Sequence, residues 1–162
     1  MYDTGDNLSL SIVVPVYSGA DFLEQLVSEI EKIRLEWSGL RVPCRIDEVI
    51  FVDDSAIDSS AQVLATLSRD RPWMTVLHLA RNYGQHAATI AGILHSSGDW
   101  VITMDEDLQH HPNQIFNLLE EALSNVAIGA GTGGGVLRQR PNIDLVVAPG
   151  LATTAAWQVI PS

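Results

Sequence analysis

The chain has 162 residues, enough for one domain, and its hydrophobic fraction of 46% and mean hydropathy of +0.14 are typical of a globular protein. Its 9 Lys and Arg against 20 Asp and Glu give a net charge of −11, which argues against nucleic-acid binding and against unaided docking on an anionic membrane. The single cysteine, Cys44, excludes an internal disulfide. No secretory leader or membrane-spanning stretch is visible, so we expect a cytoplasmic protein.

The first part of the chain predicts a strand followed by a helix. Residues 8–16 are rich in β-branched side chains, and Pro15 marks the exit of this strand because proline cannot donate a hydrogen bond within a central strand. A turn follows at Tyr17, and Asp21 can cap the next helix. Apolar residues recur there at helical spacing: Phe22, Leu23, Leu26, Val27, Ile30 and Ile33.

A second strand is predicted over residues 46–52, with Asp53 and Asp54 at its exit. If the strands are parallel, these acids lie at the same edge of the sheet as Tyr17. Asp58 is expected to cap a helix that runs to about residue 67, and capping is its whole expected role. Helix capping does not explain Asp53.

The third unit begins with a strand over residues 73–80, in which His78 is interpreted as a structural histidine and not as a ligand. A helix over residues 86–96 carries small side chains that permit close packing on a sheet. Arg81 and Gly84 precede it, and such a helix N-terminus can hold an anion through its backbone N–H groups. The alternative is that Gly84 is only a turn residue.

The fourth predicted strand, residues 100–104, runs directly into three acids: Asp105, Glu106 and Asp107. Asp105 and Asp107 lie two residues apart, so in an extended backbone they project to the same side. They can share one divalent cation with the carbonyl of Gln109, while Glu106 points away. The alternative is that the three acids are a solvated loop in front of the next helix.

Four strand–helix units in succession predict an α/β fold, with a parallel sheet and helices on both faces. The last predicted helix covers residues 112–123. Beyond residue 124 the apolar residues show no clear helical or strand periodicity. Residues 127–136 are dense in glycine but lack the Gly-Lys-Ser/Thr sequence of a phosphate-binding loop. We therefore expect a domain over residues 1–124 and a mobile or poorly packed tail over residues 125–162.

Four segments, in this order, resemble the motifs of the inverting family 2 glycosyltransferases, whose nucleotide-sugar-binding half is a Rossmann-like GT-A domain. They are Pro15-Val-Tyr-Ser-Gly, Val52-Asp-Asp-Ser, Arg81-Asn-Tyr-Gly-Gln-His and Met104-Asp-Glu-Asp-Leu-Gln-His. Within this family the chain is most similar to the polyprenyl-phosphate sugar transferases, of the dolichyl-phosphate and undecaprenyl-phosphate kinds. The match covers about residues 8–123, and the tail looks truncated or divergent relative to the family.

This resemblance implies an enzyme that moves a sugar, with inversion, from a nucleotide-sugar donor to a polyprenyl phosphate. The implied donor-binding residues are Pro15, Val16, Tyr17, Asp53, Asp54, Arg81, Gly84, Asp105 and Glu106. The resemblance also implies that Asp105, Asp107 and Gln109 hold Mg²⁺ or Mn²⁺ against the diphosphate. A cation suits an acidic protein that binds a polyanion. No catalytic residue is assigned, because a polyprenyl phosphate is already anionic and needs no base.

Two other functions fit parts of the sequence. A non-catalytic nucleotide-sugar-binding or regulatory module would keep the sheet and the pocket without turnover. A metal-dependent phosphotransfer domain would explain Asp53 and Asp54, but it lacks a suitable lysine on a later strand. For the glycosyltransferase we expect membrane association only through further segments or a partner protein. We also expect self-association through an uncovered apolar helix face.

Overall fold

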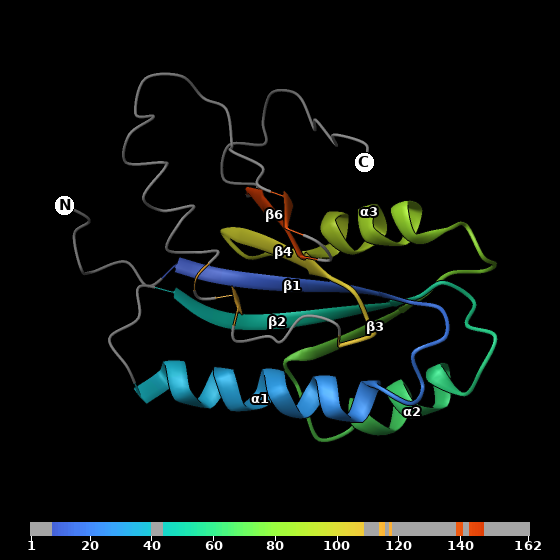
Figure 1. The fold of residues 1–162 in the computed structure, drawn as a ribbon, viewed down its shortest axis with the longest axis horizontal. Helices are drawn as coiled ribbons and strands as arrows, with labels where there is room; N and C mark the ends of the chain where they lie inside the picture. The colour runs from blue at the N-terminus through green and yellow to red at the C-terminus, as the bar shows by residue number, and fades with distance from the viewer. Residues whose placement is uncertain are drawn as a thin grey trace.

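The computed structural model describes residues 8–39, 44–108, 114, 115, 117, 139, 140 and 143–147. Its strands form a single sheet that is flanked by helices (Figure 1). In chain order the elements are β1 (Leu8–Val16), α1 (Leu23–Gly39), β2 (Cys44–Asp53), α2 (Ser60–Leu67), β3 (Met74–His78), α3 (Gln85–His95), β4 (Trp100–Met104), β5 (Gln139–Arg140) and β6 (Ile143–Val147). Gln114, Ile115 and Asn117 are also helical, and the rest of the helix expected over residues 112–123 lies outside the described residues.

The strands follow the order β3-β2-β1-β4-β6-β5 across the sheet. The pairs β1–β2, β1–β4 and β2–β3 are parallel, which confirms the α/β fold expected from the four strand–helix units. Strand β6 pairs with β4 in the antiparallel direction, and β5 pairs with β6. These two strands lie in the segment that showed no clear period, so the sequence did not predict them.

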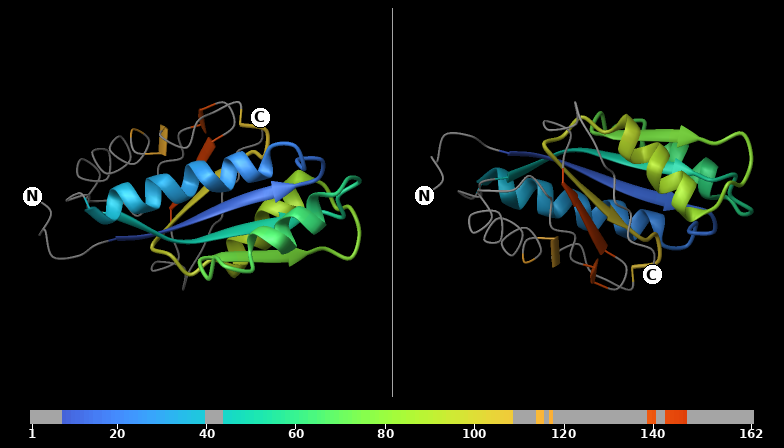
Figure 2. Two further views of the ribbon diagram at one scale, coloured as in Figure 1. Left: turned by 90° about the horizontal axis from the view of Figure 1, so that it is seen from below. Right: turned by 90° about the horizontal axis from the view of Figure 1, so that it is seen from above.

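Helices cover both faces of the sheet. Figures 1 and 2 show α1 and α2 on one face and α3 on the other. Helix α3 approaches the sheet very closely at Gly92, where an added Cβ would lie 2.3 Å from Val13 Cγ1 and 3.0 Å from Val52 Cγ2. The close packing expected from the small side chains of this helix is therefore confirmed.

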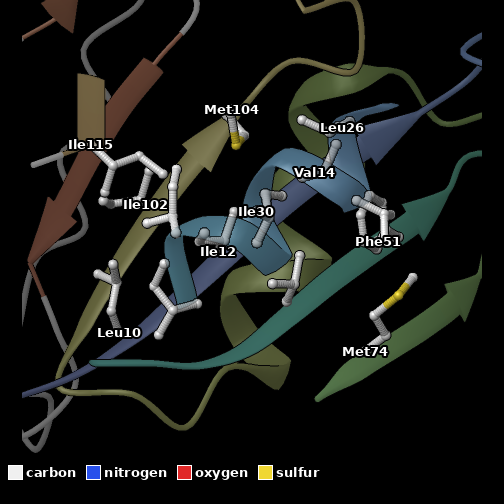
Figure 3. Close-up of a cluster of buried hydrophobic side chains, with 14 of the residues drawn as sticks. Leu10, Ile12, Val14, Leu26, Ile30, Phe51, Met74, Ile102, Met104 and Ile115 are labelled. Atoms are coloured by element: carbon white, nitrogen blue, oxygen red, sulfur yellow. The ribbon is translucent and has the colours of Figure 1, made fainter. Parts of the chain in front are cut away.

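The core follows the two-residue alternation of the strands. In β1, Leu10, Ile12 and Val14 pack toward α1 and α2, whereas Val13 packs in the smaller cluster under α3. The larger cluster also takes in residues from the helical faces and from β2 and β4 (Figure 3). Because β1 is buried on both faces, it reads as a nearly continuous apolar run. Ile115 is fully buried in the larger cluster.

Candidate functional site

The candidate site lies where the carboxyl ends of the parallel strands meet. The chain proceeds outward from β1 to β2 and β3, and then returns to place β4 on the other side of β1. Such a reversal leaves a crevice between the loops that follow the two central strands, and open α/β sheets bind their ligands there. The loops after β1 and β4 begin with Tyr17 and Asp105, two of the expected site residues.

The two acids at the exit of β2 are buried and act as hydrogen-bond acceptors within the loops. Asp53 is 6% exposed; its Oδ1 accepts the amide of Ala56 at 2.8 Å, and its Oδ2 lies 2.8 Å from His78 Nδ1. His78 itself is exposed. Its partner, Asp53, fits the interpretation of His78 as a structural residue.

Asp54 joins the end of β2 to the start of α3. Its carboxylate is 2% exposed and accepts the amide of Tyr83 at 2.7 Å and the amide of Gly84 at 2.9 Å. Gly84 has a φ of +94°, a conformation that favours glycine. The amide of Gly84, a residue that the resemblance places near the phosphates, has a carboxylate of this chain as its partner. Asp54 fixes the loop in front of α3.

Arg81 lies in the same loop and is exposed. Its guanidinium carbon stands 4.8 Å from the centre of the Tyr83 ring, which is a cation–π distance. This contact holds the cation beside the N-terminus of α3. The expected role of Arg81 at the phosphates stays a prediction.

Asp105 receives a hydrogen bond from α3 that sequence reasoning did not identify. Gln85 Nε2 donates to Asp105 Oδ1 at 2.6 Å. Gln85 belongs to the motif that suggested an anion site, but its position gave no sign of a partner 20 residues later. The contact orients the carboxylate of the first acid of the triplet.

Glu106 was expected to point away from the cation, and it is aimed at the loop after β1. Its Oε2 accepts the amide of Tyr17 at 3.0 Å, and its Oε1 accepts the amide of Ser18 at 3.1 Å. Burial raises the pKa of Glu106 above its usual value, and the two amide hydrogen bonds act in the opposite direction. The middle acid of the triplet thus connects the two sides of the crevice.

A second carboxylate supports the same loop. Asp58 Oδ2 accepts the amide of Ala20 at 3.1 Å, and its Oδ1 accepts the amide of Ser60 at 2.9 Å. Burial acts to raise the pKa of Asp58, but the hydrogen bonds from Ser60 and Ala20 outweigh it, and the pKa is lowered. Ser59 occupies the N-cap position of α2 without a side-chain hydrogen bond to the helix. The side chain that accepts the first amide of the helix is that of Asp58, the residue expected to cap it.

The remaining expected residues lie on the exit of β1. Pro15 and Val16 are buried, and the carbonyl of Val16 accepts the amide of Asp54 at 2.9 Å. Tyr17 is 40% exposed, and its carbonyl accepts the amide of Ile57 at 3.1 Å. The backbone of this exit is therefore tied to the loop after β2.

Two carboxylates of the expected metal site, Asp105 and Asp107, are half-buried at the end of β4. Gln109, the third expected ligand, lies outside the described residues. No group of three His, Cys, Asp or Glu side chains suited to a metal occurs in the part of the chain that the structure describes. The two carboxylates of Asp105 and Asp107 nevertheless fit Mg²⁺ or Mn²⁺. Such hard cations take oxygen ligands, and they bind through one or two carboxylates plus substrate phosphates.

Comparison with solved structures agrees with the fold of this chain. A mannosyltransferase from Pyrobaculum calidifontis, solved in complex with GDP-Man and Mn²⁺, superimposes with a TM-score of 0.57 at 21% identity, over 73% of this chain and 33% of that one. S. aureus TarS superimposes with a TM-score of 0.52 at 18% identity, over 82% of this chain and 39% of that one. These likenesses support the GT-A fold.

Proteins related in sequence identify the family of this chain. An undecaprenyl-phosphate 4-deoxy-4-formamido-L-arabinose transferase of Pseudomonas aeruginosa is 42% identical over 114 residues, which is 70% of this chain and 32% of the relative. The transferase of the same name from Salmonella choleraesuis is 36% identical over 128 residues, 75% of this chain and 36% of the relative. The chain thus spans about a third of the length of these relatives. The model of glycosyl transferase family 2 matches residues 11–140, and the chain belongs to that family.

Proposed function

We propose that this chain binds a nucleotide-sugar donor at the crevice between β1 and β4 and transfers the sugar, with inversion, to a polyprenyl phosphate. The observation that carries the proposal is the convergence of four polar loops at one edge of the sheet. Glu106 joins the β4 loop to the β1 loop, Asp54 joins the β2 loop to α3, and Gln85 joins α3 to Asp105. The names of the relatives support the polyprenyl-phosphate acceptor.

In this proposal Asp105 and Asp107 hold Mg²⁺ or Mn²⁺, with Gln109 as a further ligand. The cation would neutralise the diphosphate and stabilise the charge that develops on the departing nucleotide. The protein needs such a mediator, because a chain with a net charge of −11 repels a polyanion. Gln85 holds the carboxylate of Asp105 in place by its 2.6 Å hydrogen bond.

The loops after β1 and β2 would receive the nucleoside. We assign Pro15, Val16 and Tyr17 to this region. The buried Asp53 keeps the loop after β2 in shape, and the buried Asp54 does the same for the loop in front of α3. Arg81 stands beside the phosphate region. The acceptor phosphate is itself a nucleophile, so a base in this domain is not required.

The proposal extends to the surroundings of the enzyme. The acceptor is a lipid, so the domain has to work at the inner face of the membrane, in the cytoplasm. No helix in the described part of the chain is long and apolar enough to cross a bilayer. We propose that further segments or a partner protein provide the membrane contact.

Calorimetry tests the proposal directly. UDP and GDP are titrated into the chain with Mn²⁺ and, separately, with a chelator. We expect one of the two nucleotides to bind only with Mn²⁺, and Asp107→Asn to weaken that binding at least about tenfold, because it removes a ligand charge. The control is Asp70→Asn, which removes the same charge from an exposed turn.

A second arm tests the transfer itself. The chain is incubated with labelled UDP- and GDP-sugars, Mn²⁺ and a short polyprenyl phosphate, and the lipid is extracted. Label in the lipid fraction is the expected result. Absence of nucleotide binding, or binding that is equal with chelator, would contradict the proposed function.

A further inference from the structure

The loop after β1 is shaped by groups that lie far away in the sequence. Glu106 accepts the amides of Tyr17 and Ser18, and Asp58 accepts the amide of Ala20. Three backbone amides of one loop are thus bound by carboxylates from the loops after β4 and β2. A loop held in this way keeps the shape that its partners impose.

We propose that Glu106 is a positioning residue, which fixes the β1 exit loop in the shape that receives the donor and does not itself contact the donor. This inference rests on the function proposed above. Both carboxylate oxygens are engaged by backbone amides, one by Tyr17 and one by Ser18. A carboxylate turned toward a diphosphate would repel it, whereas the two amides hold the charge of Glu106 away from the donor.

Gly19 provides the space for this contact. An added Cβ would lie 2.4 Å from Glu106 Oε2, 2.8 Å from its Cδ and 3.1 Å from its Cβ. All three atoms belong to Glu106. Gly19 does not have a positive φ, so alanine is compatible with its backbone. A side chain at position 19 would therefore meet Glu106 first.

The turn from Asp105 to Leu108 is also anchored at its last residue. Leu108 has a φ of 55°, a left-handed conformation that is unusual for a large side chain, and it packs partly buried against the larger core cluster. The turn from Asp105 to Leu108 is thus anchored to the core by its last residue. Glu106 connects this anchored turn to the loop that carries Tyr17, so the positions of Tyr17 and Asp105 depend on each other.

Two variants disrupt the contact from opposite sides. Glu106→Ala removes the acceptor, and Gly19→Ala displaces it. We expect each variant to speed hydrogen exchange of the Tyr17 and Ser18 amides by about tenfold or more, because both amides lose their charge-assisted hydrogen bond to Glu106. We also expect each to weaken Mn²⁺-dependent binding of UDP or GDP by about tenfold.

The double variant Gly19→Ala/Glu106→Ala shows whether Gly19 and Glu106 act through the same contact. Once Glu106 is alanine, Gly19→Ala no longer displaces a carboxylate, so we expect it to add little to either effect. Glu106→Gln keeps one carbonyl oxygen at the same reach, and we expect it to restore slow exchange at only one of the two amides. Gly39→Ala is the matched glycine control, because an added Cβ there meets nothing within 4 Å. Glu36→Gln is the matched control for charge, on an exposed position of α1.

The readouts separate this inference from the proposed function. Unchanged amide exchange in Glu106→Ala, or faster exchange with unchanged nucleotide affinity, would overturn the positioning role and leave the proposed function standing. Additive effects in the double variant would also overturn it. A wild-type chain that binds neither UDP nor GDP would overturn both.

Discussion

Asp54 illustrates how a buried charge is kept in this domain. A carboxylate that is 2% exposed loses most of its hydration, and it is retained only when hydrogen bonds replace the water. The amides of Tyr83 and Gly84 do this, one on each oxygen. The acid thereby determines the path of the chain into α3, and with it the position of Gln85 beside Asp105.

Replacing Asp54 by asparagine should therefore destabilise the fold. The amide keeps one acceptor oxygen but faces the second backbone N–H with its own NH₂ group. We expect the free energy of unfolding, measured with urea, to fall by about 1–3 kcal/mol. Asp70→Asn, on an exposed turn, should change it by less than about 0.5 kcal/mol. Equal effects of the two variants would show that the Asp54 contacts carry no stability.

Asp99 gives a prediction for pH. Its Oδ2 accepts the amide and the hydroxyl of Ser9, both at 2.8 Å, and these bonds hold the pKa of Asp99 below its usual value of 3.8. The folded state thus favours the ionised form. Its contribution to stability is complete above the unfolded pKa and is lost as the pH falls through the lowered folded pKa.

Asp99→Asn should accordingly be less stable than the wild type at neutral pH, and the difference should shrink as the pH is lowered through 3.8 and below. Urea unfolding at a series of pH values measures the difference. A difference that stays constant over this range would contradict the role of the Ser9 hydrogen bonds.

At the scale of single residues, the sequence predicts which acids stand at the strand exits but not what they contact. Asp53, Asp54 and Asp105 follow apolar strands, a pattern that can be read directly. The partners of Glu106 and Asp105 depend on loop conformations and on contacts 89 and 20 residues away. Local periodicity contains no information about such contacts, so Gln85 and the two amide partners of Glu106 were not identified from the sequence.

Among the elements, α3 depends most closely on one position. Gly92 lets the helix backbone rest on Val13 and Val52, with an added Cβ only 2.3 Å from Val13 Cγ1. Neither valine can move aside easily, because both lie in a packed layer where even one methyl group is felt. The N-terminus of α3, which carries Gln85, is set by this contact.

Gly92→Ala should therefore overpack the interface between α3 and the sheet. We expect a loss of about 1–3 kcal/mol in the free energy of unfolding, in spite of the higher helix propensity of alanine. Combining it with Val13→Ala removes the closest neighbour, so the double variant should lose less than the sum of the two single effects. Strict additivity in urea unfolding would contradict the close approach.

The elements themselves were largely predictable. β1 and β4 have the bounds expected from their apolar runs, and the helices follow the 3.6-residue period to within a few residues. β2 starts two residues earlier than expected because Cys44 pairs in register with Leu8. β5 and β6 escaped prediction, since their sequence lacks a clear alternation. Their places in the sheet are fixed by the pairing of β6 with β4 and of β5 with β6.

For the whole molecule, the strand order and the charge together define the site. Placing β4 beside β1 creates a crevice at the point where the chain reverses its direction across the sheet. The net charge of −11 disfavours an anionic ligand that binds without a cation, and this supports the metal that we propose at the site. Self-association stays a prediction: Ile90 and Leu94 of α3 are 46% and 68% exposed, and light scattering would measure it.

The most direct test is a crystal soaked with Mn²⁺ and the nucleotide diphosphate that calorimetry selects. Anomalous scattering locates the metal independently of activity. The account predicts a single strong manganese peak within coordination distance of the carboxylates of Asp105 and Asp107, with the diphosphate on its other side. Bound nucleotide without a manganese peak beside these two carboxylates would contradict the account.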